Sequence, residues 1–413
     1  MTNNISFNVF SNLGYTSNNP YQEPINKSQL DAQNSILRIS DEKFNLNINL
    51  PHLQADLIDR TPNDPLNFKD VASFDMNIKN GILSLKDAEL SSLVKNLLKK
   101  ETDLIKDINF NFQPGNNAEV NLQVKKVLKF NIKINGKLSA QPVNNMVRFT
   151  PNKISVNKIP IQGLLKLFKL EIGELVKVGN PNGSFFTSGD SIYFGPTKFV
   201  ENPKINGEIH DVRTGLGTIS ILLGKDSANY QNTPLYGSNN YLRLRGGNVD
   251  FNGFNLQDAD VALLDGTPND PFDIENDPSQ KVISKGRVAI PEEFIATALK
   301  QKAGSGSLKN MQFTMPNGVG KLKASMWGFL PISLNLHFSK SSTGELKVTP
   351  AKGRVLGFIP LPNSLLRDTL KKETEGKIDG NGVTVDLGKL ADLQTPNGIK
   401  NVETNNGQLI LYM

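Results

Sequence analysis

Apolar and polar residues alternate over a long stretch in the first half of the chain. From Val120 to Leu138 the apolar residues other than Val127 fall on even positions, and Lys or Asn fills most odd positions from 129 onward. This period of two predicts one long β-strand, or two strands broken near Lys125-Lys126, with one apolar and one basic face. Shorter strands are predicted over Met146–Phe149 and Ile154–Ile159.

The same design returns about two hundred residues later, where even-numbered apolar residues run from Leu322 to Phe338. The turns that follow also correspond, because Thr349-Pro350 matches Thr150-Pro151. An identical pentapeptide, Thr-Pro-Asn-Asp-Pro, occurs at 61–65 and at 267–271. A repeated order of strands and turns at a nearly constant offset indicates one ancestral unit used twice.

Helical periodicity interrupts the strands at corresponding places in each copy. One helix is predicted to follow Asp87, and its counterpart to follow Pro291. A second stretch, Ile161–Val178, would place apolar residues over about half of a helix circumference. A stripe this wide needs a concave partner such as a curved sheet. Its counterpart, beginning at Asn363, is predicted to be shorter.

These elements divide the chain into a disordered arm (1–34), a first module (35–224), a polar linker (225–240) and a second module (241–413). The first 24 residues lack the basic start and apolar core of a secretory signal. Either the protein stays inside the cell, or a signal was removed, or export is unconventional, so localisation stays open. No apolar run approaches the ~18 residues that a membrane-spanning helix needs.

The net charge of +6 is unevenly distributed along the 413 residues. Residues 121–180 carry ten Lys, one Arg and two Glu. Lys129, Lys133 and Lys137 are therefore candidates for a surface that contacts anionic lipid headgroups or an anionic membrane. The alternative is a solvated strand face, on which Lys prevents aggregation. The absence of cysteine excludes disulfides and thiol catalysis.

Acidic side chains gather around the second pentapeptide. Asp265, Asp270 and Asp273 supply oxygen ligands of the kind that calcium prefers. They lack the loop pattern of a helix-loop-helix calcium site, and the first copy replaces most of the outer acids. A solvated turn is the alternative interpretation.

The residue patterns of known catalytic sites are missing from the sequence. His52, His210 and His337 lie far apart at no metal-ligand spacing, and there is no nucleophile elbow or phosphate loop. We therefore expect neither an enzyme nor a cofactor. Nucleic-acid binding is not expected either, since aromatic residues are scarce among the basic strands. Trp327 is interpreted first as a core or inter-copy packing residue, with a tunnel mouth or a membrane interface as the alternatives.

The order of two-faced strands, early helix, second apolar helix after the Thr-Pro and Ile-Pro turns, and closing Gly-x-Ile strand resembles the tubular lipid-binding (TULIP) superfamily. The nearer likeness is to the bacterial LmeA-like family. The resemblance implies an α+β fold of two tandem units, each a highly curved antiparallel β-sheet wrapped around a long amphipathic helix, in a pseudo-twofold or elongated arrangement. It also implies an apolar tunnel for lipid chains and association with the cell envelope.

We therefore expect a lipid-binding protein, with lipid transfer as one form of that activity. The expected lining residues are apolar and lie on the core strands and second helices of both copies. They are Phe130, Ile132, Ile134, Leu164, Leu165, Phe168, Ile172, Leu330, Ile332, Leu334 and Leu365. The alternative is a structural module with solid cores that binds a protein or glycan partner. The lipid and the oligomeric state are left open.

Overall fold

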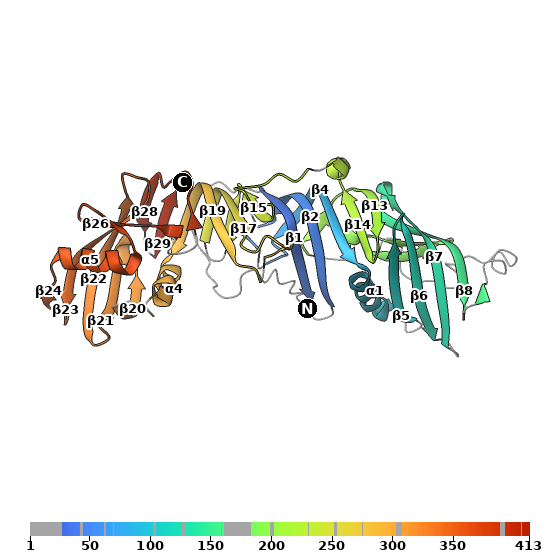
Figure 1. Cartoon of the computed structure of the whole chain (residues 1–413), viewed down its shortest axis with the longest axis horizontal. Helices are drawn as coiled ribbons and strands as arrows, with labels where there is room; N and C mark the ends of the chain where they lie inside the picture. Colours follow the sequence, from blue (N-terminus) through green and yellow to red (C-terminus); the bar gives the residue numbers. More distant parts are fainter. Residues whose placement is uncertain are drawn as a thin grey trace.

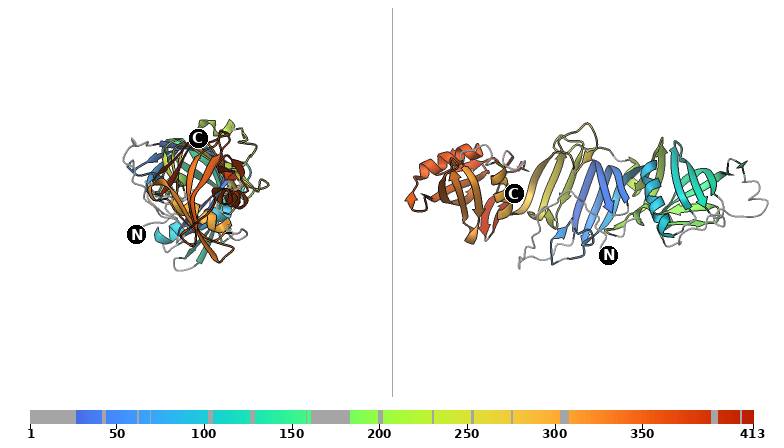
Figure 2. Two further views of the ribbon diagram at one scale, coloured as in Figure 1. Left: turned by 90° about the vertical axis from the view of Figure 1, so that its left-hand side faces the viewer. Right: turned by 90° about the horizontal axis from the view of Figure 1, so that it is seen from below.

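The computed structural model describes residues 27–41, 44–61, 63–68, 70–101, 105–125, 129–157, 159–160, 183–198, 202–229, 231–251, 254–274, 276–302, 308–388, 393–405 and 407–413. Strands account for 62% of the structure and helices for 14%. The molecule is elongated, with one continuous sheet through the middle and one smaller sheet toward each end (Figure 1). Figure 2 shows the three sheets following one another along the long axis.

The expected α+β fold, with each curved sheet wrapped around a long amphipathic helix, was wrong. In the described part of the chain there are three α-helices: α1 (Asp87–Glu101), α4 (Glu292–Lys302) and α5 (Asn363–Thr374). Helices α1 and α4 lie where the central sheet meets each end sheet (Figure 1). The helix expected over Ile161–Val178 lies outside the described residues. The fold is mostly β because alternation with a period of two runs through most of the chain.

The central sheet contains strands from both copies. The order of its main path is β13-β14-β4-β2-β1-β15-β17-β19-β29-β28. These strands are β13 (Ile209–Gly215), β14 (Thr218–Leu223), β4 (Phe74–Lys86), β2 (Phe44–Asp59), β1 (Lys27–Asp41), β15 (Tyr241–Arg245), β17 (Phe254–Asp265), β19 (Ser279–Pro291), β29 (Gln408–Tyr412) and β28 (Asn401–Asn405). The short strands β3 (Leu66–Asn67), β12 (Lys204–Asn206), β16 (Asn248–Phe251), β18 (Phe272–Asp273) and β27 (Leu393–Gln394) pair at its sides.

The two end sheets have the same topology. The first contains β5 (Ile105–Gln113), β6 (Asn117–Lys125), β7 (Lys129–Gln141), β8 (Met146–Val156), β9 (Ile159–Pro160), β10 (Phe185–Ser188) and β11 (Ser191–Phe194). The second contains β20 (Leu308–Thr314), β21 (Gly320–Met326), β22 (Leu330–Lys340), β23 (Leu346–Val355), β24 (Ile359–Pro360), β25 (Lys377–Asp379) and β26 (Gly382–Val385). Strands β6 and β7 are the two expected from the alternation, and even-numbered Val120, Leu122, Ile134 and Leu138 are buried.

A local twofold relation joins the two copies at β1 and β15, which pair antiparallel with Leu30 opposite Leu244. On its other side β1 pairs with β2, where Leu30 faces Ala55, and β15 pairs with β17, where Leu244 faces Val261. Ala55 and Val261 lie 206 residues apart, as do the two pentapeptides. Leu30 and Leu244 are therefore equivalent residues that face each other across the axis.

Each pentapeptide turn leads into a short strand that pairs with the other copy. The turn of the first copy leads into β3, which pairs with β16 of the second copy. The turn of the second copy leads into β18, which pairs with β1 of the first copy. Asp59 accepts hydrogen bonds from the backbone N–H and hydroxyl of Thr61 at 2.7 and 3.1 Å, and Asp265 does the same for Thr267 at 2.7 and 3.0 Å. Each pentapeptide is thus a turn that directs a short strand of its own copy against the sheet of the other copy.

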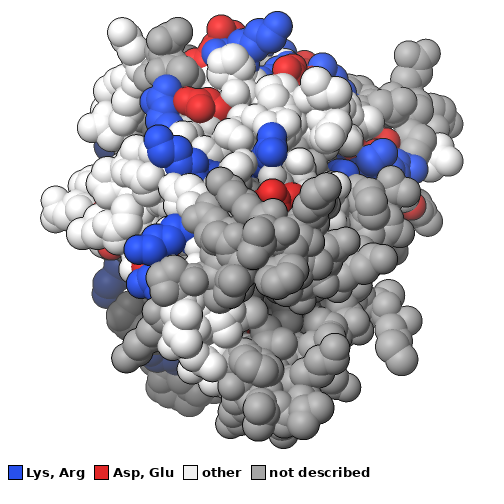
Figure 3. All heavy atoms as spheres, turned by 90° about the vertical axis from the view of Figure 1, so that its right-hand side faces the viewer, with Lys and Arg blue, Asp and Glu red and all other residues white. Residues whose placement is uncertain are grey.

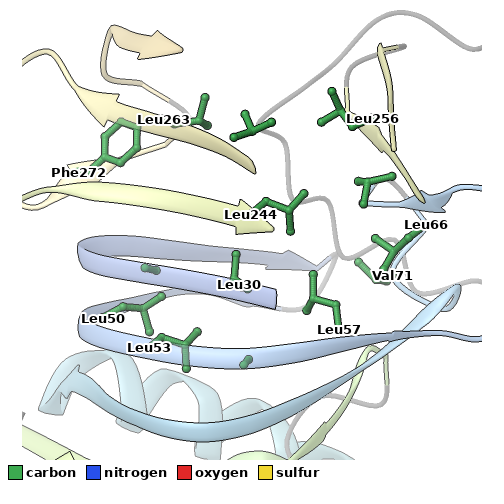
Figure 4. Close-up of a cluster of buried hydrophobic side chains, with 14 of the residues drawn as sticks. Leu30, Leu50, Leu53, Leu57, Leu66, Val71, Leu244, Leu256, Leu263 and Phe272 are labelled. Carbon is green, nitrogen blue, oxygen red and sulfur yellow. The ribbon is translucent and has the colours of Figure 1, made fainter. Parts of the chain in front are cut away.

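Apolar side chains from both copies meet beneath the central sheet (Figure 4). Leu30, Leu53 and Leu57 of the first copy are buried in the same cluster as Leu244 and Phe272 of the second. Each buried side chain of this size contributes roughly 1.5–3 kcal/mol to folding. The two copies therefore share one continuous core.

The expected boundaries differ from the structure at the arm. Strand β1 begins at Lys27, so residues 27–34 belong to the central sheet rather than to a disordered arm. Residues 1–26 lie outside the described residues. Within the expected linker, Lys225–Asn229 form a 3₁₀ helix, and Leu235 bridges to Ser238 before β15 starts.

Candidate ligand-binding cavity

An apolar cavity of about 320 Å³ lies inside the second copy. It is lined by strands of the central sheet, by strands of the second end sheet, and by helices α4 and α5. Its lining residues are Phe254, Leu256, Val261, Lys281, Ile283, Ile290, Phe294, Ile295, Ala298, Leu299, Phe313, Leu336, Phe338, Leu346, Val348, Leu370, Thr374, Val385, Leu387, Leu393 and Leu409. Nineteen of these twenty-one residues are apolar.

Helix α4 differs from its counterpart α1 at the cavity. Because α1 follows β4 and α4 follows β19, Leu90 corresponds to Ile295 and Leu93 to Ala298. In α1, Leu90 and Leu93 are each 1% exposed, so this helix packs closely against its surroundings. In α4, Ala298 presents a much shorter side chain, and it is half-buried beside the cavity. The change from Leu to Ala at this position leaves space between helix and sheet.

Two pairs of aromatic rings form rigid parts of the cavity wall. The rings of Phe254 and Phe294 meet edge to face, with centroids 4.3 Å apart at an interplanar angle of 67°. Phe313 and Phe338 meet in the same way at 6.2 Å and 83°. Edge-to-face pairs hold each other's orientation. The cavity is therefore bordered by fixed aromatic surfaces on the central-sheet side and on the end-sheet side.

A larger cleft of about 900 Å³ adjoins the cavity. Lys281, Leu346, Val385, Leu387 and Leu393 line both spaces. The remaining cleft residues include several polar side chains. These are Ser279, Gln280, Glu345, Asp386, Gln394 and Thr395. An apolar chamber that adjoins a polar cleft matches the two ends of an amphiphilic molecule.

The lining residues expected in the second copy lie near the cavity but are not among its lining residues. Ile332 and Leu334 are buried on β22, and Leu330 packs against the core at the start of that strand. The cavity is lined instead by Leu336 and Phe338, farther along β22. Leu365 is 45% exposed at the start of α5.

In the first copy, Ile134 is buried on β7 and Ile132 packs against the same core. The side chains of Phe130, Leu164, Leu165, Phe168 and Ile172 lie outside the described residues. They are therefore neither placed in a cavity nor excluded from one.

The three lysines expected at a headgroup surface belong to β7. The Nζ of Lys133 forms an ion pair with Glu119 at 2.5 Å, and Lys137 is exposed. The side chain of Lys129 lies outside the described residues. Over the described surface at this end of the molecule, basic and acidic side chains are interspersed (Figure 3).

Sequence reasoning missed the part that α4 plays in the cavity. Periodicity predicted a helix after Pro291, and four of its apolar residues, Phe294, Ile295, Ala298 and Leu299, line the cavity. The signal was available, because Ala298 stands where the first copy has Leu93. A smaller residue at one of two equivalent positions indicates either closer packing or a space.

Two of the three acidic residues considered for calcium, Asp265 and Asp273, have protein partners for their carboxylates. Asp265 accepts hydrogen bonds from Thr267 and from the side-chain amide of Asn240, and Asp273 forms an ion pair with Arg38. Among the described residues, no group of three or more His, Asp or Glu side chains is arranged to hold a metal ion.

The histidines are separated in the structure as they are in the sequence. His52 is fully buried in β2, and burial lowers its pKa from 6.5 to about 4 because the charged form is disfavoured there. His210 and His337 are exposed on β13 and β22. None of the three lines the cavity or its cleft.

No helix in the described ranges combines the length and the apolar character that crossing a membrane would require. No protein-family model matches the chain, and no curated protein matches it.

Proposed function

We propose that the protein binds a lipid acyl chain, or another long apolar ligand, in the cavity beside α4, with the polar end of the ligand in the adjoining cleft. The observation that carries this proposal is the lining of the cavity, in which Lys281 and Thr374 are the two polar residues among twenty-one. The TULIP resemblance, drawn from the order of sequence elements, points to the same class of ligand.

The size of the cavity and its apolar lining support this proposal. Ligand sites commonly enclose about 300–1,000 Å³, and this cavity falls at the lower end of that range. An apolar cavity of this kind holds water poorly, so an entering hydrocarbon displaces little that is tightly bound. Each methylene transferred from water contributes about 0.8 kcal/mol, so a chain of ordinary length binds without any specific polar contact.

The cleft would select the polar end of the ligand. Lys281 is the one charged residue that lines both cavity and cleft, and its ammonium group favours a carboxylate or phosphate close to the apolar tail. Glu345 and Asp386 line only the cleft and disfavour further negative charge there. A ligand with one acidic group fits this arrangement better than a polyanionic one.

The alternative is a structural or interaction module with solid cores. Closely packed interiors contain few voids larger than a water molecule. A cavity of about 320 Å³ is much larger than such voids, and it therefore favours the ligand-binding proposal.

Native mass spectrometry of the full chain purified without detergent would test the proposal. We expect a mass increase of one lipid per chain, removed by organic extraction and restored by added fatty acid. Displacement of a fluorescent fatty acid by unlabelled fatty acid would give the affinity. If the protein neither carries nor takes up lipid in either experiment, the proposal is wrong.

A further inference from the structure

Exposed apolar side chains gather at one end of the second end sheet. The β21–β22 turn carries Trp327 and Phe329, which are 64% and 76% exposed. The β23–β24 turn carries Leu356 and Phe358, which are 49% and 72% exposed. Strands β22 and β23 are neighbours, and the N–H of Leu356 donates to the carbonyl of Pro331 at 3.0 Å, so the two turns lie side by side. We call these four residues the apolar tip.

The backbone of both turns is unfavourable for the residues that occupy it. Trp327 and Gly328 have φ of 55° and 87°, and Leu356 and Gly357 have φ of 54° and 82°. Turns with two left-handed residues favour Asn, Asp or Gly at the first position, and a bulky side chain there is uncommon. The β8–β9 turn of the first copy has Asn157 with φ of 49°. Local turn geometry therefore does not account for Trp327 and Leu356.

The apolar tip projects into open space. A Cβ added to Gly328 or to Gly357 would meet no atom within 4 Å. The ring centroids of Trp327 and Phe329 lie 6.3 Å apart, and the planes are tilted by 33°. Figure 1 shows β21 to β24 in the end sheet at the left of the molecule, with the β21–β22 turn at its lower edge. Both turns therefore present exposed apolar side chains to open space.

Basic residues lie on the strands next to the apolar tip. Between Leu308 and Arg367 the chain has eight Lys or Arg residues and one acidic residue, Glu345. Two of the eight, Lys347 and Arg367, form ion pairs with Asp379 and Asp368. Lys323 and Arg354 are exposed, and both lie opposite Ser333 in the sheet, one on each neighbouring strand. Basic side chains thus stand behind the apolar turns, where they would meet the phosphates of an anionic lipid layer.

We propose that the apolar tip inserts into the interfacial region of an anionic lipid bilayer. Trp is the side chain that prefers this region, and Phe and Leu reach the acyl boundary below it. The basic residues of the same sheet add electrostatic attraction to acidic headgroups. This surface is separate from the cavity and does not depend on a ligand being bound there. Exposed apolar turns with Lys323 and Arg354 on the adjoining strands are complementary to an anionic bilayer and not to a second copy with the same charge.

Trp327 is the only tryptophan of the chain, so its fluorescence reports directly on the apolar tip. We expect the emission of the full-length protein to shift to shorter wavelength when vesicles of phosphatidylcholine with phosphatidylglycerol are added. The shift should be smaller with phosphatidylcholine alone and should weaken at high salt, because salt screens the lysines. Co-sedimentation with vesicles and an unchanged emission would overturn the proposal, because the protein would then bind through another surface.

Two double variants distinguish binding through the apolar tip from nonspecific binding through any exposed apolar residue. Phe329→Ser combined with Phe358→Ser keeps Trp327 as the reporter and should lower vesicle partitioning by about tenfold or more. Val143→Ser with Leu216→Ser is the matched control, because these residues are 98% and 77% exposed in the first copy. An equal loss in both double variants would overturn the proposal.

Two further measurements test whether the apolar tip binds a second copy and whether it acts independently of the cavity. If the tip bound a second copy, size-exclusion chromatography would show an oligomer that the Phe329→Ser, Phe358→Ser variant loses, and the bilayer proposal would be overturned. Fatty-acid displacement should be unchanged in this variant, so a failure of the tip is distinguishable from a failure of the cavity.

Discussion

Arg38 of the first copy and Asp273 of the second form an ion pair across the junction between β1 and β18. The Nε of Arg38 donates to the two carboxylate oxygens of Asp273 at 3.2 and 3.1 Å, and Nη1 donates to Asn47 at 3.3 Å. The side chain of Asp273 is 11% exposed, so its charge depends on this partner. A bidentate pair of this kind fixes the position of one copy against the other.

Replacement of Arg38 by Met should therefore destabilise the whole molecule. We expect a loss of about 1–3 kcal/mol in the free energy of unfolding, since a mostly buried carboxylate is left without its charge partner. Chemical denaturation would measure it. Arg213→Met is the control, because the Arg213–Asp211 pair is exposed on both sides and should contribute less than about 1 kcal/mol. Equal effects would contradict this interpretation.

The buried His52 should make stability depend on pH. Burial lowers its pKa from 6.5 to about 4, so between these values the unfolded chain binds a proton that the folded chain does not. The free energy of unfolding therefore contains the full contribution of neutral His52 above about pH 6.5. This contribution decreases as the pH falls, by up to about 3 kcal/mol at pH 4. Unfolding measured from pH 7.5 to 4 should show a shallower decline in His52→Gln. An identical decline in both proteins would contradict the prediction.

The cavity should close when Ala298 is replaced by the residue of the first copy. Ala298→Leu should lower fatty-acid affinity by about tenfold or more, while added apolar contact keeps stability equal or higher. The reciprocal change, Leu93→Ala, removes a side chain that is 1% exposed and should cost about 2–5 kcal/mol of stability. Displacement titrations and thermal unfolding would measure both. Unimpaired binding by Ala298→Leu would place the ligand elsewhere.

Lys281 should distinguish acidic from neutral ligands. Lys281→Met keeps the length of the side chain but loses the charge, so affinity for a fatty acid should fall about tenfold, equivalent to ~1.4 kcal/mol, while a fatty alcohol binds as before. Lys285→Met serves as the control, since Lys285 is exposed on the same strand and lines neither space. Displacement by matched acid and alcohol would show whether the effect is selective.

Leu356 of the apolar tip should lower the free energy of unfolding, because its backbone has a positive φ. Leu356→Asn places a residue suited to φ of 54° in the β23–β24 turn, and we expect a gain of roughly 0.5–1 kcal/mol. The same variant should bind anionic vesicles more weakly, because one apolar side chain of the tip is removed. A variant that is both less stable and unchanged in vesicle binding would contradict the idea that Leu356 is kept for its contacts outside the protein.

The strands that sequence predicts best are those with one buried and one exposed face. Strands β6 and β7 were visible because Val120, Leu122 and Ile134 alternate with polar residues. Strand β1 was assigned in part to a disordered arm because its buried residues include Gln33 and Ser35, which are 0% exposed. A polar residue that is buried by neighbouring strands has no signature in a single sequence.

The site was harder to predict than the strands. Alternation is the same for a filled core and for one with a space, so the lining residues expected on β22 were Leu330, Ile332 and Leu334 instead of Leu336 and Phe338. The favoured interpretation of Trp327 as a core residue was wrong, because it lies in a turn and is 64% exposed. The long enclosed helix was wrong as a fold description because the described structure is mostly strand and contains no long helix wrapped by a sheet.

The facing pair Leu30 and Leu244 also bears on the history of the chain. A single-copy precursor with this edge strand would have paired with a second molecule of itself in the same antiparallel register. Each molecule would have added a short strand to the sheet of the other. Gene duplication and fusion would then have turned a symmetric dimer into one polypeptide. Once joined, the two halves could differ: one now has leucine at residue 93 and a filled helix contact, and the other has alanine at residue 298 beside a cavity.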